Sequence, residues 1–327
     1  MRRQYADVAD ADFIQASGYP CSNSGDGDYM RILISGSHGL VGNALSSELT
    51  KDGHQIVSLV RHKSGSLSEI EWHPNQGSIE SEHVSGFDAV IHLAGESIAS
   101  GRWTDEKKQK IRDSRVKGTT LLSEALARSS KPPETFISAS AIGYYGNRGD
   151  ELLNERSTAG DDFLAEVCAA WETATVKAEA SGIRTVHARF GIILDQNGGA
   201  LSKMLTPFRM GVGGKIGDGK QWMSWIALAD VIRGLKFVIE NDSITGAVNF
   251  VAPNPVTNGE FTKTLGDVLG RPTLFPMPSF VARLAFGEMA DALLLSSAKV
   301  EPKRLQDGGY RFEFEKLQPA FESILKS

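Results

Sequence analysis

Three glycines at three-residue spacing, Gly36, Gly39 and Gly42, follow the short apolar run ILIS at 32–35. The run is short and β-branched, as expected of a buried strand, and apolar residues recur at helical spacing directly after it. A second apolar run, 56–60, comes after a further glycine. This order of strand, glycine turn, helix and strand predicts half of a βαβ dinucleotide-binding unit. The alternative is an ordinary glycine-rich turn.

Each glycine has a predicted role in that unit. Gly36 permits the tight turn after the strand, Gly39 lets a pyrophosphate approach the backbone, and Gly42 allows close packing of helix on sheet. The spacing is G-x-x-G-x-x-G rather than the commoner G-x-G-x-x-G. Free N–H groups and the helix dipole favour a phosphate at the helix start. The predicted phosphate-binding turn consists of Gly36, Ser37, His38, Gly39, Leu40, Val41 and Gly42.

The end of the second strand predicts which dinucleotide is bound. An acidic residue at this position binds the ribose 2′-hydroxyl of NAD, whereas an arginine suits the 2′-phosphate of NADP. The sequence has no acid there and instead reads Arg61, His62, Lys63. We therefore predict NADP, with Arg61 at its 2′-phosphate. A solvated strand end is the alternative.

A second strand end contributes further predicted cofactor contacts. The buried-strand pattern DAVIHL at 88–93 runs into Ala94 and Gly95. Small residues there let a cofactor lie against the backbone, although they also suit a tight turn into a helix. The predicted contacts are Leu93, Ala94 and Gly95.

Composition excludes several functional classes. The net charge is −5, with both signs interspersed, which is no electrostatic footprint for nucleic acid. The sequence has no apolar run long enough for a membrane span and no Cys/His cluster with zinc-ligand spacing. Two cysteines, Cys21 and Cys168, make a disulfide framework improbable and fit a reducing cytoplasm. We expect a cytoplasmic protein without a metal, a membrane partner or a nucleic-acid partner.

Strand and helix patterns alternate from Met30 onward, which predicts an α/β fold with a doubly wound parallel sheet. Residues 1–29 lack apolar periodicity and are predicted to be a flexible leader. One apolar helical face is predicted over 163–178. Glycines crowd 196–224, as in a mobile loop lining a site. The predicted division is a Rossmann domain at 30–195 with about 225–252, and a smaller α-rich cap at about 196–224 with 253–327.

Residues 30–327 resemble the atypical short-chain dehydrogenase/reductases called epimerase family proteins, which carry a C-terminal domain of unknown function. The resemblance implies an extended-type Rossmann fold, NADP binding and a small-molecule substrate. By analogy with the family, it also suggests a homodimer formed through helices that flank the sheet. The motifs that carry it are ISGSHGLVG, IHLAGESIASGRWT, IRDSRVKGT, SASAIGYYG, FLAEVCAAWE, MSWIALADV and GEMADALLLSSAKVEPKRL.

The resemblance also locates the positions of the usual catalytic residues Asn, Ser, Tyr and Lys. Leu164 stands at the Tyr position and Cys168 at the Lys position, and neither can replace the original chemistry. Arg115 stands at the Asn position. The serine alone is kept, as Ser140, with Ser138 in the same strand as a further predicted cofactor contact.

Each of these candidates has a structural alternative. Cys168 either borders the cofactor or packs in the core, and Ser140 either binds the reacting oxygen or caps a turn. Tyr144 is the candidate proton donor in place of the missing tyrosine, unless the Tyr144–Tyr145 pair is a buried loop anchor. Arg115 either binds an anion of cofactor or substrate, or forms a surface salt bridge.

Two functions from different classes remain open. One is an NADP-dependent oxidoreductase or epimerase-like enzyme acting on a small hydroxyl, carbonyl or nucleotide-sugar-like substrate, with Ser140, Tyr144 and Arg115 at the reacting centre. The other is a non-catalytic NADP-binding sensor or scaffold that regulates a protein partner, which the loss of the Tyr–Lys pair favours.

Overall fold

The computed structural model describes residues 29–62, 65–66 and 68–326. The predicted leader, apart from Tyr29, lies outside the described residues, as do Cys21 and Lys63.

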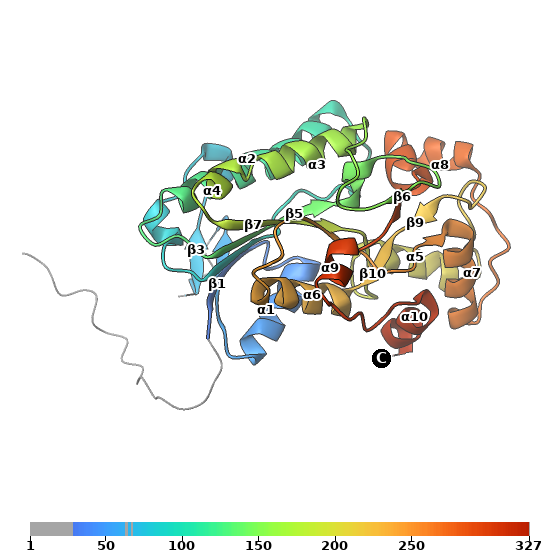
Figure 1. Ribbon diagram of the computed structural model, residues 1–327. Helices are drawn as coiled ribbons and strands as arrows, with labels where there is room; N and C mark the ends of the chain where they lie inside the picture. The colour runs from blue at the N-terminus through green and yellow to red at the C-terminus, as the bar shows by residue number, and fades with distance from the viewer. Residues whose placement is uncertain (1–28, 63–64, 67, 327) are drawn as a thin grey trace, which may run out of the picture.

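Seven strands within the described residues pair in parallel, in the order β11-β7-β5-β4-β1-β2-β3 (Figure 1). From β1 the chain runs outward to β2 and β3, and it then returns to place β4 on the other side of β1. Open sheets of this kind bind ligands beyond their carboxyl ends at such a reversal. The doubly wound parallel sheet predicted from the sequence is confirmed. The strands are β1 (Arg31–Ser35), β2 (Gln55–Val60), β3 (Glu69–Glu71), β4 (Ala89–His92), β5 (Thr135–Ala141), β7 (Arg184–Phe190) and β11 (Gly246–Phe250).

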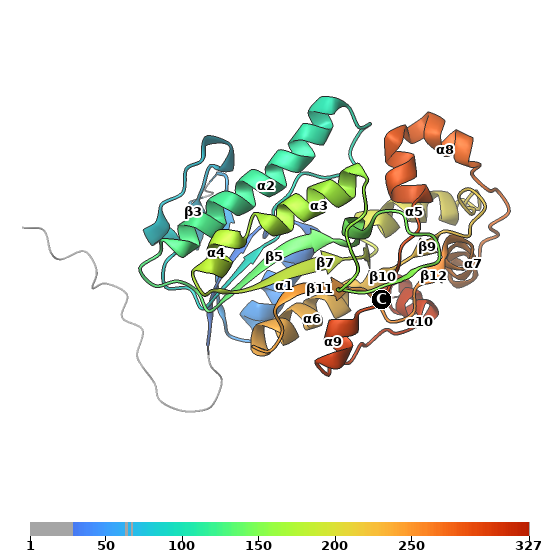
Figure 2. The ribbon, with the colours of Figure 1, turned by 45° about the horizontal axis from the view of Figure 1, so that its top comes forward.

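Helices cover both faces of this sheet (Figure 2). One face carries α2 (Asp105–Ala127), α3 (Phe163–Thr173) and α4 (Val176–Ala180). The other carries α1 (Leu40–Lys51), α6 (Leu228–Glu240) and α9 (Lys303–Asp307).

The interior of β1 is apolar on both sides because both faces of the sheet are covered there. In β1, Ile32 and Ile34 pack in the cluster under α1 and α6, whereas Leu33 packs in the cluster under α2. All three side chains are fully buried. This two-sided burial fixes the position of the glycine turn that follows the strand.

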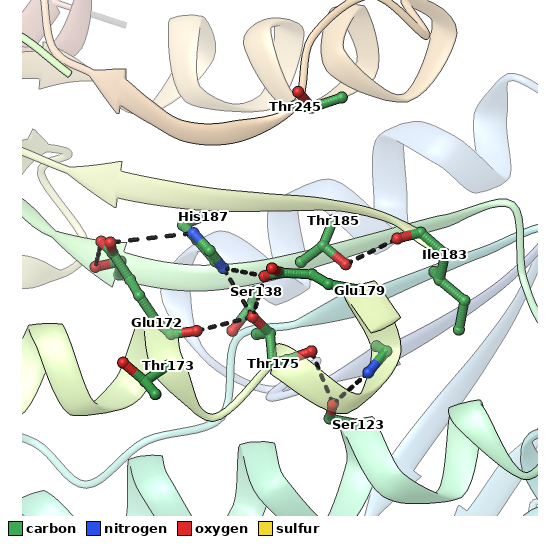
Figure 3. Close-up of polar contacts among 12 residues, drawn as sticks. Ser123, Ser138, Glu172, Thr173, Thr175, Glu179, Ile183, Thr185, His187 and Thr245 are labelled. Atoms are coloured by element: carbon green, nitrogen blue, oxygen red, sulfur yellow. Dashed lines mark hydrogen bonds and ion pairs between the residues drawn. The ribbon is translucent and has the colours of Figure 1, made fainter. Parts of the chain in front are cut away.

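The single helix predicted over 163–178 is interrupted between α3 and α4, so that prediction was wrong in detail. The Ser123 hydroxyl of α2 donates to the Thr175 carbonyl (3.0 Å) and accepts from the Ala178 amide (2.9 Å), as Figure 3 shows. Ser123 thus takes part in the backbone bonding at the junction, where a continuous helix would bond only to itself. Such an insertion is a recognised cause of helix breaks.

A third core lies beyond the carboxyl edge of the sheet. It joins α5 (Gly199–Arg209), α7 (Asn258–Leu269) and α10 (Leu317–Lys326) around the buried Trp225. The glycine-rich stretch is therefore partly helical and not a loop throughout, because Leu201, Leu205 and Phe208 bury one helical face there.

Short elements complete this region. Three small pairings border the main sheet, and a helix and a π-helical turn follow α7. The pairings are β8 (Ile192–Leu194) with β10 (Trp225–Ala227), β9 (Trp222–Met223) with β12 (Val256–Thr257), and β6 (Leu152–Leu153) with β13 (Lys299–Val300). The helix is α8 (Ser279–Phe286) and the π-helical turn is Ala290–Leu295. Across the described part of the chain, helices fall short of the length and apolarity that crossing a membrane requires.

Candidate functional site

The glycine turn has the geometry that its sequence predicts. Gly36 has a φ of 72°, and a Cβ added to it would lie 2.8 Å from the Ala94 nitrogen. A Cβ on Gly42 would lie 2.2 Å from the Gly36 carbonyl oxygen. Only glycine can therefore make this turn and bring the start of α1 against it. The tight turn at Gly36 and the close packing at Gly42 are confirmed.

The start of α1 presents unsatisfied backbone N–H groups. Gly39 caps the helix without a side-chain hydrogen bond, and the first turn contains no acidic residue. The amides of Leu40, Val41 and Gly42 precede the first intrahelical bond, which the Asn43 amide makes to Gly39. Together with the helix dipole, these amides make the N-terminus of α1 suitable for binding an anion.

The remaining residues of the predicted phosphate-binding turn lie around this helix start. Ser37 is nearly buried, and its hydroxyl lies 3.5 Å from His38 Nδ1. The Leu40 side chain packs toward α5, since a Cβ on Gly198 would lie 2.9 Å from it. The predicted phosphate-binding residues are thus brought together.

The end of β4 lies directly against the glycine turn. The Leu93 carbonyl carbon and the Ala94 nitrogen are the atoms nearest to Gly36. Beneath them, the Ser35 hydroxyl lies 2.5 Å from His92 Nδ1 and 3.4 Å from the Ala94 amide that donates to it. Burial lowers the pKa of His92 to about 4, so the imidazole is neutral near pH 7. Two strand ends that the sequence singled out separately therefore form one surface.

Arg61 follows β2, two strands away from β4. Its side chain is exposed and makes no hydrogen bond or ion pair within the described part of the chain. His62 beside it is also exposed. The position is compatible with the predicted 2′-phosphate contact, because an unpaired guanidinium keeps all of its donors for a ligand.

At the end of β5, Ser140 is 2 % exposed, and its hydroxyl donates to the Glu172 carboxylate at 2.7 Å. Glu172 is held by two bonds of 2.7 Å from Arg189 Nε and Nη2, a bidentate ion pair. Burial opposes the charge on Arg189, but its bonds to Glu172 raise the Arg189 pKa overall. Ser138, further inside the same strand, is buried, and its hydroxyl reaches only the Ala139 carbonyl at 3.5 Å.

The two tyrosines of GYYG differ in their surroundings. Tyr145 is fully buried; its hydroxyl donates to Asn249 (2.8 Å) and accepts from Arg189 (3.0 Å). Burial raises the pKa of Tyr145 to about 12. The Tyr144 ring lies on the Arg189 guanidinium, 3.5 Å from Cζ to the ring centre, and its hydroxyl has no hydrogen-bond partner among the described residues. Tyr145 is therefore the loop anchor, and Tyr144 carries the free phenol.

Leu164 and Cys168 on α3 face the turn after β5. A Cβ on Gly143 would lie 3.4 Å from Leu164 and 3.8 Å from the Cys168 sulfur. The Cys168 thiol is buried, and burial raises its pKa to about 12. Neither residue supplies an acid, a base or a cation. Leu164 and Cys168, expected from the resemblance to stand at the positions of the usual catalytic pair, thus form an apolar contact with this turn.

Arg115 of α2 lies between α3 and the loop that follows β4. Its guanidinium lies against Gly95, and Cζ is 4.9 Å from the Trp171 ring centre. Nη1 donates to the carbonyls of Glu96 (3.0 Å) and Ile111 (3.1 Å). The surface salt bridge considered from the sequence is absent from the described residues.

Figure 3 shows a cluster behind Glu172 that sequence reasoning missed. His187 of β7 lies 2.9 Å from the Thr175 hydroxyl, 3.3 Å from Glu179 and 4.0 Å from Glu172. Burial lowers the His187 pKa, against the attraction of the two carboxylates. The sequence signal was the placing of His187 and Arg189 within a central strand, since charged residues are seldom buried without partners. No group of three His, Cys, Asp or Glu among the described side chains is placed to hold a metal ion.

Comparison with known proteins agrees with this geometry. Residues 32–250 match the NAD dependent epimerase/dehydratase family, and residues 277–324 match a domain of unknown function, DUF1731. An epimerase family protein of Mycobacterium tuberculosis is 42 % identical over 281 residues, covering 86 % of this chain and 93 % of the relative. The human epimerase family protein SDR39U1 is 35 % identical over 299 residues, covering 90 % of this chain and 100 % of the human protein.

A crystal structure of the human protein with NADPH superposes with a TM-score of 0.85 at 33 % identity, covering 91 % of this chain and 99 % of that one. MoeE5 in complex with UDP-glucose and NAD shares the fold, with a TM-score of 0.72 at 19 % identity, covering 90 % and 97 %. The resemblance that the sequence motifs suggested is confirmed. The chain belongs to the NAD dependent epimerase/dehydratase family.

Proposed function

We propose that this protein is an NADPH-dependent oxidoreductase or epimerase-like enzyme that acts on a small hydroxyl, carbonyl or nucleotide-sugar-like substrate. The observation that carries the proposal is the glycine turn, where the close backbone approach at Gly36 and Gly42 brings the unsatisfied amides at the start of α1 beside the end of β4. The substrate would lie between the sheet edge and the cap formed by about 196–224 and 253–327.

The residues present fit the dinucleotide. The amides of Leu40, Val41 and Gly42 would hold its pyrophosphate, and Arg61 would hold a 2′-phosphate. The NADPH in the human relative supports this assignment. When bound, the nicotinamide would supply hydride transfer.

Two hydroxyls would handle the reacting oxygen. The Ser140 hydroxyl donates its hydrogen bond to Glu172, so its lone pairs remain to accept a hydrogen bond from a substrate hydroxyl. The Tyr144 phenol has no partner among the described residues, and its ring is held on Arg189. Tyr144 is therefore the group we assign to proton transfer, in place of the tyrosine that Leu164 replaces.

The experiment that tests the proposal follows NADPH consumption against a panel of carbonyl compounds and nucleotide sugars. Ser140→Ala and Tyr144→Phe should each lower kcat by about 100-fold or more while leaving the NADPH dissociation constant nearly unchanged. Thr185→Val, which removes a buried hydroxyl at the start of β7, is the matched control. Full turnover in both site variants would remove these residues from the mechanism.

A sensor or scaffold is the second candidate, favoured by the apolar contact of Leu164 and the buried Cys168 thiol. In that case NADPH would bind without turnover and would control association with a partner. Cofactor-dependent association, with no consumption over the whole panel, would favour the sensor; any turnover would exclude a purely regulatory role. The homodimer expected by analogy stays a prediction, to be measured by sedimentation.

A further inference from the structure

Arg115 is a largely buried arginine that keeps an open hydrogen-bonding edge. Only its Nη1 donates hydrogen bonds, to two backbone carbonyls. Its Nε and Nη2 have no acceptor within the residues that the structure describes, and no carboxylate lies within ion-pair distance of it there. A guanidinium has five donor hydrogens, so most of its capacity is unused.

Two other arginines with buried guanidinium groups are bound at more of their nitrogens. Arg189 bonds through Nε, Nη1 and Nη2. Arg184 bonds to the Thr135 hydroxyl and several carbonyls, and its Nε lies 3.4 Å from Asp242. Among the described residues Arg31 also bonds through Nη1 alone, but it lies at the amino end of β1. Because buried charges are normally paired, the open edge of Arg115 at the carboxyl side of the sheet is suited to a ligand.

The neighbours of Arg115 do not neutralise it. The Glu96 carboxylate is bound by Lys107 at 2.5 Å and does not form an ion pair with Arg115. The nearby Cys168 thiol remains protonated because burial raises its pKa. Burial also lowers the pKa of Arg115, although an arginine stays charged near neutral pH.

The guanidinium of Arg115 lies at the ligand-binding side of the sheet. A Cβ on Gly95, in the loop that follows β4, would lie 3.4 Å from its Cζ, 3.5 Å from Nη2 and 3.6 Å from Nη1. The preceding residue, Ala94, abuts Gly36 of the glycine turn. Arg115 therefore adjoins the dinucleotide surface, on the β4 side rather than the β2 side where Arg61 lies.

The shape of the edge indicates what it binds. Nε and Nη2 lie on one side of the planar guanidinium, and their N–H groups match two oxygens of a carboxylate or phosphate. We propose that the Nε/Nη2 edge of Arg115 binds an anionic oxygen pair of a ligand lying over Gly95. Resting on the proposed function, the anion comes either from the dinucleotide phosphates or from an acidic group of the co-substrate.

Isothermal titration calorimetry of the full chain distinguishes these sources. NADPH, inorganic phosphate and malonate are titrated into the wild type, Arg115→Gln and Arg115→Lys, the two anions with and without saturating NADPH. Arg112→Gln, an exposed arginine one turn earlier on α2, is the matched control. Thermal midpoints check that each variant is folded, and Arg115→Lys carries the test if the glutamine variant is not.

We expect Arg115→Gln to weaken NADPH binding at least about tenfold if the anion is the cofactor's. If it is the substrate's, NADPH binding is unchanged and malonate or phosphate binding to the NADPH complex is lost. Arg115→Lys should lose most of the same affinity, since a lysine ammonium lacks the pair of parallel N–H groups that binds two oxygens. Wild-type affinities of Arg115→Gln for all three probes would overturn the inference, and a lysine variant equal to wild type would overturn the two-oxygen geometry. If the wild type binds malonate through Arg115 and does not bind NADPH, the proposed function is contradicted and the inference about Arg115 is not.

Discussion

Arg189 and Arg115 both lie near the carboxyl edge of the sheet, but the protein holds them in opposite ways. Arg189 is bound at each of its three nitrogens by Glu172 and Tyr145. Arg115 is bound through one nitrogen by backbone carbonyls. A fully paired guanidinium organises its surroundings, whereas one with an open edge is available to a ligand. The two arginines at this edge therefore differ in how many of their donors remain for a ligand.

The contrast extends to the two halves of the site. Around β1 and α1, the backbone amides and the nearby Arg61 have no partners among the described residues, as a binding surface requires. Around β5 and β7, Ser140, Glu172, Arg189 and Tyr145 bond mainly to one another. We call the first region, at β1 and α1, the open half and the second, at β5 and β7, the closed half.

The largest expected effect on the free energy of unfolding comes from replacing Arg189, the fully paired arginine. Arg189→Met would leave the Glu172 charge buried without its partner, which costs about 3–5 kcal/mol of the free energy of unfolding. Arg128→Met removes an exposed partner of Glu124 and should cost under about 1 kcal/mol. Urea denaturation followed by tryptophan fluorescence measures both. An equal, small loss in the two variants would show that the Glu172–Arg189 pair does not hold this region.

The neutral histidine beneath the open half gives the next largest effect. The pKa of His92 is about 4 in the folded protein against 6.5 in the unfolded chain. Below pH 6.5, His92 is protonated in the unfolded state but not in the folded state, so the free energy of unfolding falls as the pH drops toward 4. The loss is about 3 kcal/mol over that window.

Urea denaturation between pH 7 and pH 4 measures this slope. His92→Gln should flatten it, and His83→Gln, an exposed histidine, controls for the removal of a charge alone. An unchanged slope in His92→Gln would mean that this imidazole does not govern acid stability.

Gly42→Ala tests whether the open half depends on its close packing. The added Cβ would lie 2.2 Å from the Gly36 carbonyl oxygen, so α1 must move away from the turn. We expect the NADPH dissociation constant to rise at least about tenfold, or 1.4 kcal/mol. Calorimetry measures the change, with the neighbouring exposed Asn43→Ala as control. Wild-type affinity in Gly42→Ala would argue against a dinucleotide at this turn.

Sequence reasoning found the open half because its signals are local. A glycine that must turn and a run that must be buried on both sides are properties of a few consecutive residues. The NADPH of the human relative agrees with the cofactor predicted from Arg61.

Ser140 and the tyrosine pair of the closed half were predicted, but their bonds were not, because these join distant parts of the chain. Glu172 bonds to Ser140 and Arg189 from a different element, and periodicity shows which face of an element is buried but not which residue it meets. The break at Thr175 depends on Ser123 of another helix in the same way. In the glycine-rich stretch, the abundance of glycine obscured the apolar spacing of α5.

The central claim is that the open half binds NADPH through the glycine turn and Arg61. Its most direct test is a calorimetric comparison of NADPH and NADH dissociation constants, for the wild type and for Arg61→Gln, at one ionic strength. We predict that the wild type binds NADPH at least about tenfold more tightly than NADH, and that Arg61→Gln removes most of this preference. Equal or tighter binding of NADH by the wild type would contradict the claim.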